Sequence, residues 1–281
     1  MKTISIVNMK GGVAKTTLAV NIADCLVRRH DLKVLLIDID PQFNATQCLL
    51  SGDDYVQKCK EGQHTIVHLF EDAPRPSVAS VNGAKMLKPV KIEDITPWKI
   101  KNNFHLIPGA LELYRLDMAG GQGREQRLRR FISYLKENEK YDIVIIDTPP
   151  TPSAWMASAL LASDFFIVPV KPEPLSATGI DLLRVVVDRV KENYGLDLKC
   201  IGVVLTIAEE NTIVYRKAKD FIDNNEYWKG KRFRYSLPKR TEIARMQDDQ
   251  KLILDSSDSK LKHALVSITR ELLDKIDLKG N

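Results

Sequence analysis

The chain has 281 residues, of which 44% are hydrophobic and 28% charged, and its formal net charge is +5. This balance is typical of a globular protein with a sizeable core and excludes a disordered, collagen-like or coiled-coil chain. No apolar run approaches the roughly 18 residues of a membrane-spanning helix, and the first residues do not follow the pattern of a secretory signal. The four cysteines form no CxxC pair, so we expect a cytoplasmic protein with reduced thiols.

Short apolar runs alternate with longer helical patterns along most of the chain. Runs rich in Ile, Val and Leu predict strands at residues 3–7, 33–37, 104–107, 142–146, 165–170 and 199–205. Helical spacing predicts helices at residues 16–29, 125–139, 153–162 and 177–194. Because the apolar runs are continuous rather than alternating, we predict an α/β fold: a doubly wound, mostly parallel sheet with helices on both faces.

Two segments depart from this alternation within what we expect to be one domain over residues 1–281. Residues 52–103 are rich in proline and mixed charges, hold one short helical piece at 65–71, and form an excursion of a functional or mobile kind. Residues 260–276 carry a single apolar stripe, which predicts a helix that docks on the core. A membrane-surface helix is the alternative, although Glu271 and Asp274 would be repelled by anionic lipid.

A phosphate-binding loop is predicted between the first strand and the first long helix. Glycines there let backbone N–H groups approach phosphate oxygens, and the helix N-terminus adds partial positive charge. Lys15 can reach the β- and γ-phosphates, and the Thr16 hydroxyl can bind Mg²⁺. The usual GxxxxGK[ST] spacing is absent, but a second lysine stands beside the glycine pair. The loop comprises Lys10, Gly11, Gly12, Val13, Ala14, Lys15, Thr16 and Thr17.

Three carboxylates follow two of the predicted strands. Asp38 and Asp40 end the second strand, and Asp147 ends the strand at 142–146. Side chains two residues apart on a strand point the same way, and the carboxyl ends of parallel strands are where such sheets bind ligands. The sequence therefore predicts an acidic cluster beside the phosphate-binding loop.

In these motifs the sequence resembles the deviant Walker A P-loop ATPases of the ParA/MinD type. It is most similar to ParA (Soj-like) partition ATPases without an N-terminal DNA-binding extension. The resemblance rests on KGGVAKTT (10–17), VLLIDIDPQFNAT (34–46), YDIVIIDTPP (141–150), the strand at 203–206 and the turn at Leu237 and Pro238, and it extends over nearly the whole chain.

The resemblance implies ATP and Mg²⁺ as cofactors and a role for each motif. Lys10 is the signature lysine that reaches the nucleotide of the partner subunit in an ATP-bound sandwich homodimer, and Lys15 is the P-loop lysine. Thr16 is a Mg²⁺ ligand, and Asp38 and Asp147 hold the ion largely through water. Asp40 positions the attacking water, and Pro238 and Arg240 border the adenine.

The resemblance also implies DNA segregation of a plasmid or chromosome. The ATP dimer would bind non-specific double-stranded DNA at the nucleoid, and hydrolysis stimulated by a ParB-like centromere-binding partner would release it. Ala14 replaces a glycine common in the family, and the family's basic residue after the proline turn falls on Glu242. Nearby basic residues supply the candidate DNA contacts instead: Lys231, Arg232, Arg234, Lys239, Arg240 and Arg245.

The charge distribution favours a polyanion partner independently of the resemblance. Residues 216–245 contain ten Lys or Arg and four Asp or Glu, a net +6 that exceeds the excess of the whole chain. A solvated helix face followed by a basic loop is the alternative. A MinD-like membrane-associated positioning ATPase is the rival function, but residues 278–281 are a poor basic amphipathic tail, so no stable membrane association is expected.

Overall fold

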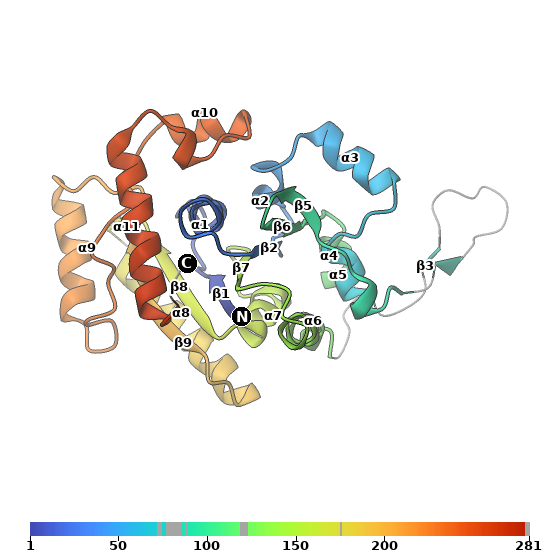
Figure 1. Ribbon diagram of the computed structural model, residues 1–281. Coiled ribbons are helices and arrows are strands. Elements are labelled where there is room, and N and C mark those ends of the chain that lie inside the picture. Colours follow the sequence, from blue (N-terminus) through green and yellow to red (C-terminus); the bar gives the residue numbers. More distant parts are fainter. Residues whose placement is uncertain (72–74, 77–85, 88, 119–122, 175, 279–281) are drawn as a thin grey trace.

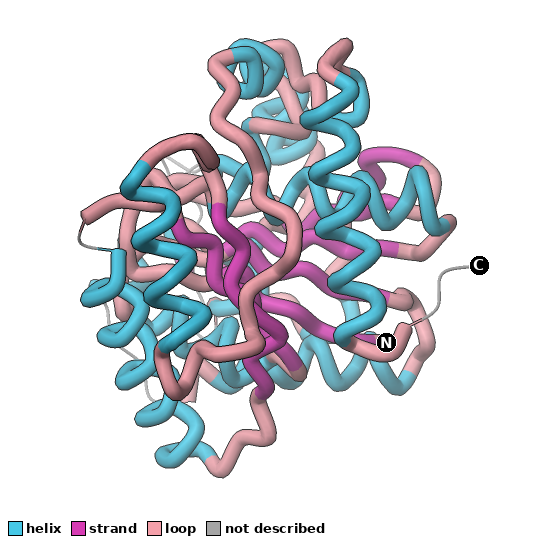
Figure 2. Tube along the Cα trace, turned by 90° about the vertical axis from the view of Figure 1, so that its left-hand side faces the viewer, coloured by secondary structure: helices cyan, strands magenta, loops and turns pink. Residues whose placement is uncertain are grey.

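The computed structural model describes residues 1–71, 75–76, 86–87, 89–118, 123–174 and 176–278. A seven-stranded sheet with the order β5-β6-β2-β7-β1-β8-β9 forms its centre (Figures 1 and 2). Every neighbouring pair is parallel except β5 and β6. The strands are β1 (Lys2–Ile6), β2 (Val34–Asp38), β5 (Trp98–Lys101), β6 (Phe104–Ile107), β7 (Ile143–Asp147), β8 (Phe165–Val170) and β9 (Lys199–Leu205).

Helices cover both faces of this sheet, so the predicted doubly wound α/β fold is confirmed (Figure 1). One face carries α1 and α11, and the other carries α6, α7 and α8. The helices are α1 (Lys15–His30), α2 (Asn44–Gln47), α3 (Gly52–Lys60), α4 (Ile66–Phe70), α5 (Leu113–Met118), α6 (Gln126–Glu137), α7 (Ala154–Ala162), α8 (Ser176–Tyr194), α9 (Ile213–Asn224), α10 (Glu242–Asp248) and α11 (Ser259–Lys275), with 3₁₀ turns η1 (Ile92–Asp94) and η2 (Ile253–Asp255).

The six predicted strands are confirmed, with ends that differ by one residue at most. In β2 and β7 the residues point alternately into the core against α1 and the core against α6 and α7; Leu36 and Ile145 lie in the first, Ile37 and Ile146 in the second. These side chains are fully buried, which explains why each run is apolar throughout. The continuous pattern therefore reflects a sheet covered on both faces.

The excursion at 52–103 contains more regular structure than its sequence predicts. The short helix α4 is confirmed, but α3, β5, η1 and the two-residue strands β3 (Arg75–Pro76) and β4 (Met86–Leu87) were not predicted. The strand β5 extends the sheet as an antiparallel edge, where Trp98 is almost fully buried. Its polar and apolar residues alternate, which is why a search for continuous apolar runs misses it.

The helix α11 packs across α1 and completes the core on that face (Figure 1). The apolar stripe that the sequence assigns to residues 260–276 is buried there, with Leu261, Leu265, Ile268 and Leu272 fully covered. Asp258 caps the helix, since its carboxylate accepts from the N–H groups of Lys260 and Leu261 at 2.9 and 3.0 Å.

The basic segment 231–234 runs beside β9 and is fixed there by backbone hydrogen bonds. The N–H of Val203 donates to the carbonyl of Lys231 at 2.8 Å, and the N–H of Phe233 donates to the carbonyl of Val203 at 2.8 Å. Gly202 permits this close approach, because a Cβ there would lie 2.3 Å from the Lys231 oxygen and 2.8 Å from the Phe233 ring.

We predict that Gly202→Ala lowers the free energy of unfolding by roughly 1–3 kcal/mol, because the new methyl group overpacks this contact. Chemical denaturation of the variant and the parent measures the difference. Gly179→Ala on α8 is the matched control, since a Cβ there meets nothing within 4 Å and alanine favours a helix. Equal stability of Gly202→Ala and the parent would contradict the tight packing of residues 231–233 on β9.

Candidate nucleotide-binding site

The predicted phosphate-binding loop joins β1 to α1, and hydrogen bonds from neighbouring residues fix its backbone. Ala14 precedes the helix with a left-handed backbone (φ 61°), as does Gly12 (φ 70°). The Thr206 hydroxyl donates to the carbonyl of Val13 at 2.8 Å, and the Lys10 N–H donates to the Asn8 side chain at 2.9 Å. Ala14 therefore keeps the conformation that glycine adopts without strain, at a cost of about 1 kcal/mol.

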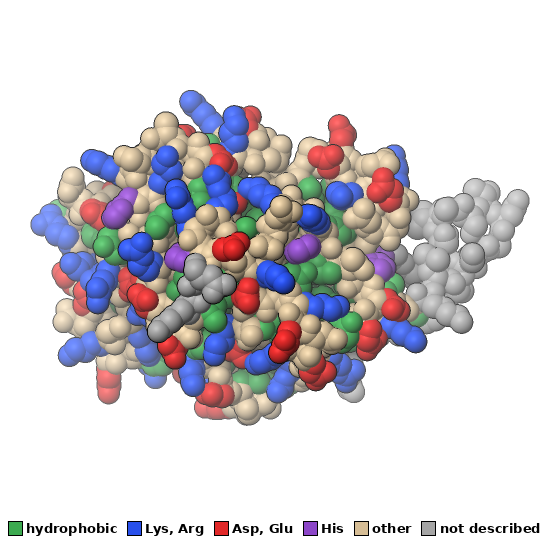
Figure 3. Space-filling model, viewed as in Figure 1, with side chains coloured by type: hydrophobic (Ala, Val, Ile, Leu, Met, Phe, Trp, Pro, Cys, Tyr) green, Lys and Arg blue, Asp and Glu red, His purple; other side chains and the backbone are tan. Residues whose placement is uncertain are grey.

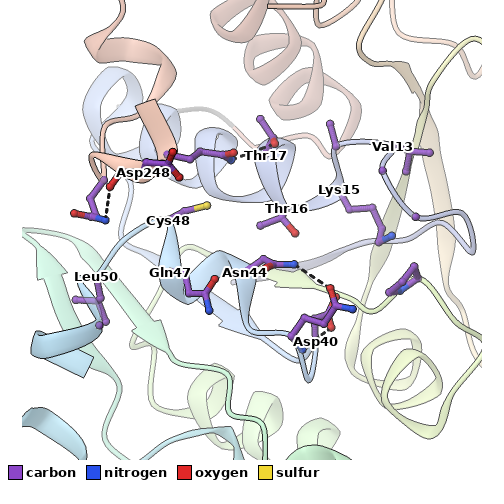
Figure 4. A pocket seen from close by; sticks show the side chains of 18 residues that line it. Val13, Lys15, Thr16, Thr17, Asp40, Asn44, Gln47, Cys48, Leu50 and Asp248 are labelled. Carbon is purple, nitrogen blue, oxygen red and sulfur yellow. Dashed lines mark hydrogen bonds between the residues drawn. The ribbon is translucent and has the colours of Figure 1, made fainter. Parts of the chain in front are cut away.

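A cavity of about 690 Å³ lies over this loop (Figure 4). Seven of the eight residues predicted for the loop line it, and Asp40 joins them from the end of β2. The eighth, Lys10, does not line the cavity. The remaining lining residues come from α2 and its flanks, from the turn after β7 and from α10: Gln42, Asn44, Gln47, Cys48, Leu50, Gly52, Pro150, Gln247, Asp248 and Gln250.

Lys15 enters the cavity from the first turn of α1 (Figure 4). The residue is only 7% exposed, and burial lowers the pKa of its ammonium group, while Asp147 and Asp40 act in the opposite direction. Its ammonium donates to the carbonyl of Lys10 at 3.3 Å. A buried ammonium with so few protein partners is well suited to bind phosphate oxygens.

Asp38 and Asp147 lie side by side beneath the cavity, because the register of β2 and β7 pairs them directly. Both residues are fully buried. Burial and the Asp147 charge raise the pKa of Asp38 well above its usual range; hydrogen bonds from Thr46 oppose this. Burial raises the pKa of Asp147 to about 7, against the hydrogen bond from Thr16. A bound cation would therefore stabilise the ionised form of both carboxylates.

The oxygen atoms around Asp147 fit a magnesium ion. The Thr16 hydroxyl donates to Asp147 Oδ2 at 2.7 Å, which brings together a hydroxyl and a carboxylate of the kind that Mg²⁺ prefers. The other oxygen, Asp147 Oδ1, is buried and has no hydrogen-bond partner among the described residues. An orphaned buried carboxylate oxygen is costly unless an ion or a water approaches it. Asp38 supplies the second carboxylate of this oxygen-rich cluster.

Asp40 lines the cavity, as Figure 4 shows, whereas Asp38 and Asp147 are not among its lining residues. Its Oδ1 accepts from the Gln42 N–H at 2.9 Å, and burial raises its pKa while this bond and Lys15 lower it. Because it lines the cavity that holds Lys15 and Thr16, its carboxylate is placed to orient a small polar molecule there.

Lys10 turns away from the cavity in this conformation. Its ammonium forms an ion pair with Glu173, on the segment that follows β8. Glu173 also pairs with Lys171 at 2.5 Å, and the two lysines lower the pKa of Glu173 to about 2. Lys10 is thus close to the phosphate-binding loop in sequence but contributes no side chain to the cavity.

Pro238 and Arg240 do not line the cavity either. Pro238 pairs with Ala208 through the backbone, and the Arg240 guanidinium donates to Asp258 at 2.6 Å. The C-terminal end of α10 lines the cavity instead, and Gln247 donates to the Thr17 hydroxyl at 3.3 Å. These α10 residues carry no motif in the sequence, because the polar run at 247–250 marks only the end of a short helix.

Several of the residues predicted to contact DNA already pair with other groups of the protein. The Arg232 guanidinium donates to Asp223 through two nitrogens, at 2.9 and 3.0 Å, and Lys231 donates to the Tyr227 carbonyl at 2.6 Å. Lys239 pairs with Glu209 at 2.8 Å. The side chains of Arg234 and Arg245 are exposed and make no hydrogen bond or ion pair with the described residues.

The charged side chains do not form one uniform patch on the face that carries α10 and α11. Lys and Arg are spread over it and interleaved with Asp and Glu (Figure 3). The net +6 of residues 216–245 already includes Asp223, and acids from outside the stretch neutralise part of the remainder: Glu209 pairs with Lys239 and Asp258 with Arg240.

Comparison with known proteins places the chain in a family. Residues 1–200 match the AAA domain family AAA_31, and the chain is 30% identical to the sporulation initiation inhibitor protein Soj of Bacillus subtilis over 90% of each protein. The chain therefore belongs to the ParA/MinD type of P-loop ATPases within this family. The resemblance drawn from its motifs is confirmed.

Solved structures agree with the fold. A putative plasmid partition protein from Borrelia burgdorferi bound to AMPPNP superposes with a TM-score of 0.76 at 23% identity, over 98% of this chain and 99% of that one. Cobyrinic acid a,c-diamide synthase from Mycobacterium smegmatis with bound ATP analog and magnesium has a TM-score of 0.73 at 23% identity, over 99% and 96%. Because a partition protein and a biosynthetic enzyme share it, this fold does not by itself define the function.

We predict that Asp147 makes the metal-free protein less stable as the pH rises. Burial raises the pKa of Asp147 to about 7 in the folded state, whereas in the unfolded chain its pKa returns to the ordinary aspartate value of about 3.8. Between these values the folded state binds more protons, so the free energy of unfolding falls with pH, by up to about 1.4 kcal/mol per unit.

Urea unfolding in EDTA at several pH values between 4 and 7 measures this slope, and Asp147→Asn should flatten it. Asp164→Asn is the control, because Asp164 is a half-exposed aspartate outside the cavity. Parallel pH profiles for Asp147→Asn and the parent would contradict the raised pKa.

Proposed function

We propose that the protein is an ATPase that hydrolyses ATP to ADP and phosphate with Mg²⁺, and that its nucleotide state switches a DNA-bound dimer. The observation that carries this proposal is the meeting of Lys15, Thr16 and three carboxylates around one cavity. The partition-type relatives support the same reading. Adenine rather than guanine as the base rests on the family.

Hydrolysis needs charge neutralisation and a positioned water more than covalent chemistry. The loop N–H groups and Lys15 would bind the β- and γ-phosphates. Thr16 and, through water, Asp38 and Asp147 would hold Mg²⁺, which neutralises charge on the phosphate oxygens. Asp40 would orient the attacking water and accept its proton, since it lines the cavity beside Lys15.

Dimerisation would bring a second lysine, Lys10 of the other subunit, to the nucleotide. Lys10 lies outside the cavity of its own chain, and its pairing with Glu173 keeps it at the surface, with 40% of the side chain exposed. In an ATP-bound sandwich homodimer it would bind the nucleotide of the partner subunit. ATP then favours the dimer because only that state offers Lys10 the phosphates.

We further propose that the dimer binds double-stranded DNA through phosphates, without sequence preference, at the nucleoid of the cytoplasm. A ParB-like centromere-binding protein would stimulate hydrolysis and release it, so that a plasmid or chromosome is segregated. Among the described residues, no helix has the length and apolar character needed to cross a bilayer. A MinD-like membrane-associated positioning ATPase is the alternative function.

We predict that Asp40→Ala slows ATP hydrolysis roughly 100-fold or more, because the attacking water loses its orienting base. The ATP-dependent dimer should persist, since Lys15 still binds the phosphates and Lys10 is unchanged. Phosphate release and light scattering after gel filtration measure the two properties. Asp197→Ala, at an exposed carboxylate far from the cavity, is the control. Normal turnover in Asp40→Ala would refute the assigned role.

Retention on duplex DNA of mixed sequence tests the switch itself. With ATP we expect retention that falls steeply with salt, and with ADP or no nucleotide we expect little; Lys15→Ala should lose it because it cannot bind ATP. Arg234→Ala with Arg245→Ala should weaken retention and reduce the salt slope by about one unit per lost phosphate contact.

The matched control for this double variant is Arg129→Ala with Arg130→Ala, which removes two exposed arginines from α6 on the opposite face of the sheet. If ATP-bound protein is not retained on DNA at any salt concentration, the DNA switch is wrong. Sedimentation with anionic liposomes would then test the membrane alternative.

A further inference from the structure

Thr46 makes two hydrogen bonds to one oxygen of Asp38. Its N–H and its hydroxyl both donate to Asp38 Oδ2, each at 2.8 Å. Thr46 lies in the short helix α2 and is 1% exposed, and Asp38 is fully buried. Asp38 Oδ1, by contrast, accepts only from the Asp40 N–H within the described residues, at 3.3 Å. Two hydrogen bonds therefore fix Oδ2 of the carboxylate, and Oδ1 remains available to a further ligand.

The direction of the Thr46 hydroxyl is fixed by a backbone group on another segment. The Gly109 N–H donates to Thr46 Oγ1 at 2.9 Å. An N–H group can only donate, so the hydroxyl uses a lone pair for Gly109 and directs its single proton to Asp38. Glycine allows this approach, since a Cβ at 109 would lie 2.6 Å from the Phe43 Cβ and 3.0 Å from the Asp38 Cγ.

The loop around Gly109 is itself held by the excursion at 52–103. The Tyr55 hydroxyl of α3 donates to the Gly109 carbonyl at 3.0 Å, and the Ile66 N–H of α4 donates to the Pro108 carbonyl at 2.9 Å. The Tyr55 ring stacks on Phe43, with centroids 5.6 Å apart, and contacts Trp98 of β5 at 5.7 Å. Hydrogen bonds from two elements of the excursion thus stabilise the loop that orients Thr46, and Trp98 of β5 packs on Tyr55.

We propose that Thr46 is a positioning residue for Asp38 in the metal site, and that Gly109 and Tyr55 hold Thr46 in place. The inference rests on the proposed magnesium-dependent function and assigns roles to three residues outside the acid cluster. By holding Oδ2, Thr46 would leave Oδ1 available to the water shell of the ion. A carboxylate free to rotate would present this oxygen less consistently, and outer partners of this kind typically change metal affinity 10- to 100-fold.

The test uses Mn²⁺ as a paramagnetic probe for the magnesium site, measured by electron paramagnetic resonance in the presence of ADP. Thr46→Val keeps the shape of the side chain and removes the hydroxyl, and it should weaken Mn²⁺ binding roughly 10-fold or more. Thr46→Ser keeps the hydroxyl and should stay within a few-fold of the parent. Thr269→Val, at a buried threonine of α11 remote from the cavity, controls for the loss of a buried hydroxyl.

Tyr55→Phe extends the test to the excursion and removes the hydroxyl that donates to the Gly109 carbonyl. It should weaken Mn²⁺ binding by a smaller factor, and it serves as the decisive variant if Thr46→Val does not fold. Unchanged Mn²⁺ affinity in folded Thr46→Val would overturn the proposal, as would unchanged affinity in Tyr55→Phe where Thr46→Val is unfolded. Failure of the parent itself to bind ADP and Mn²⁺ would instead reject the proposed function.

Discussion

Two buried aspartates, paired in register at the ends of adjacent parallel strands, constrain the rest of this site. Asp38 of β2 lies opposite Asp147 of β7, and neither side chain reaches solvent. Two carboxylates in such a place repel one another and are costly to ionise. The surrounding groups stabilise the ionised carboxylates: Thr16 and Thr46 donate hydrogen bonds, and Lys15 brings a positive charge from α1. A divalent cation would complete the compensation.

The parts of the site that the sequence predicts are those encoded locally. The loop at 10–17 and the acids at strand ends each depend on a short stretch of chain, so their residue types reveal them. The parallel sheet follows from runs that are apolar on both faces. From these two facts alone, the meeting of Lys15, Thr16, Asp38 and Asp147 could be anticipated, because parallel strands end at the same edge.

The parts that the sequence did not reveal depend on contacts between distant segments. Gly109 is one glycine among 14, and only the approach of Phe43 and Asp38 gives it significance. Gln247 borders the cavity because α10 folds back over Thr17, 230 residues earlier in the chain. The count of basic residues at 216–245 likewise cannot show that Arg232 is already neutralised by Asp223.

The ion pair between Lys10 and Glu173 is weak enough to open reversibly in the nucleotide switch that we propose. Both side chains are partly exposed, so solvent screening keeps the pair weak. Lys171 also contacts Glu173, which means that the carboxylate keeps a cationic partner when Lys10 leaves. The cost of releasing Lys10 is correspondingly small, and in the proposed dimer the triphosphate of a nucleotide bound to the partner subunit, with several negative charges, would outcompete one carboxylate. The pair would therefore hold Lys10 on its own chain without preventing its transfer across the dimer that we propose.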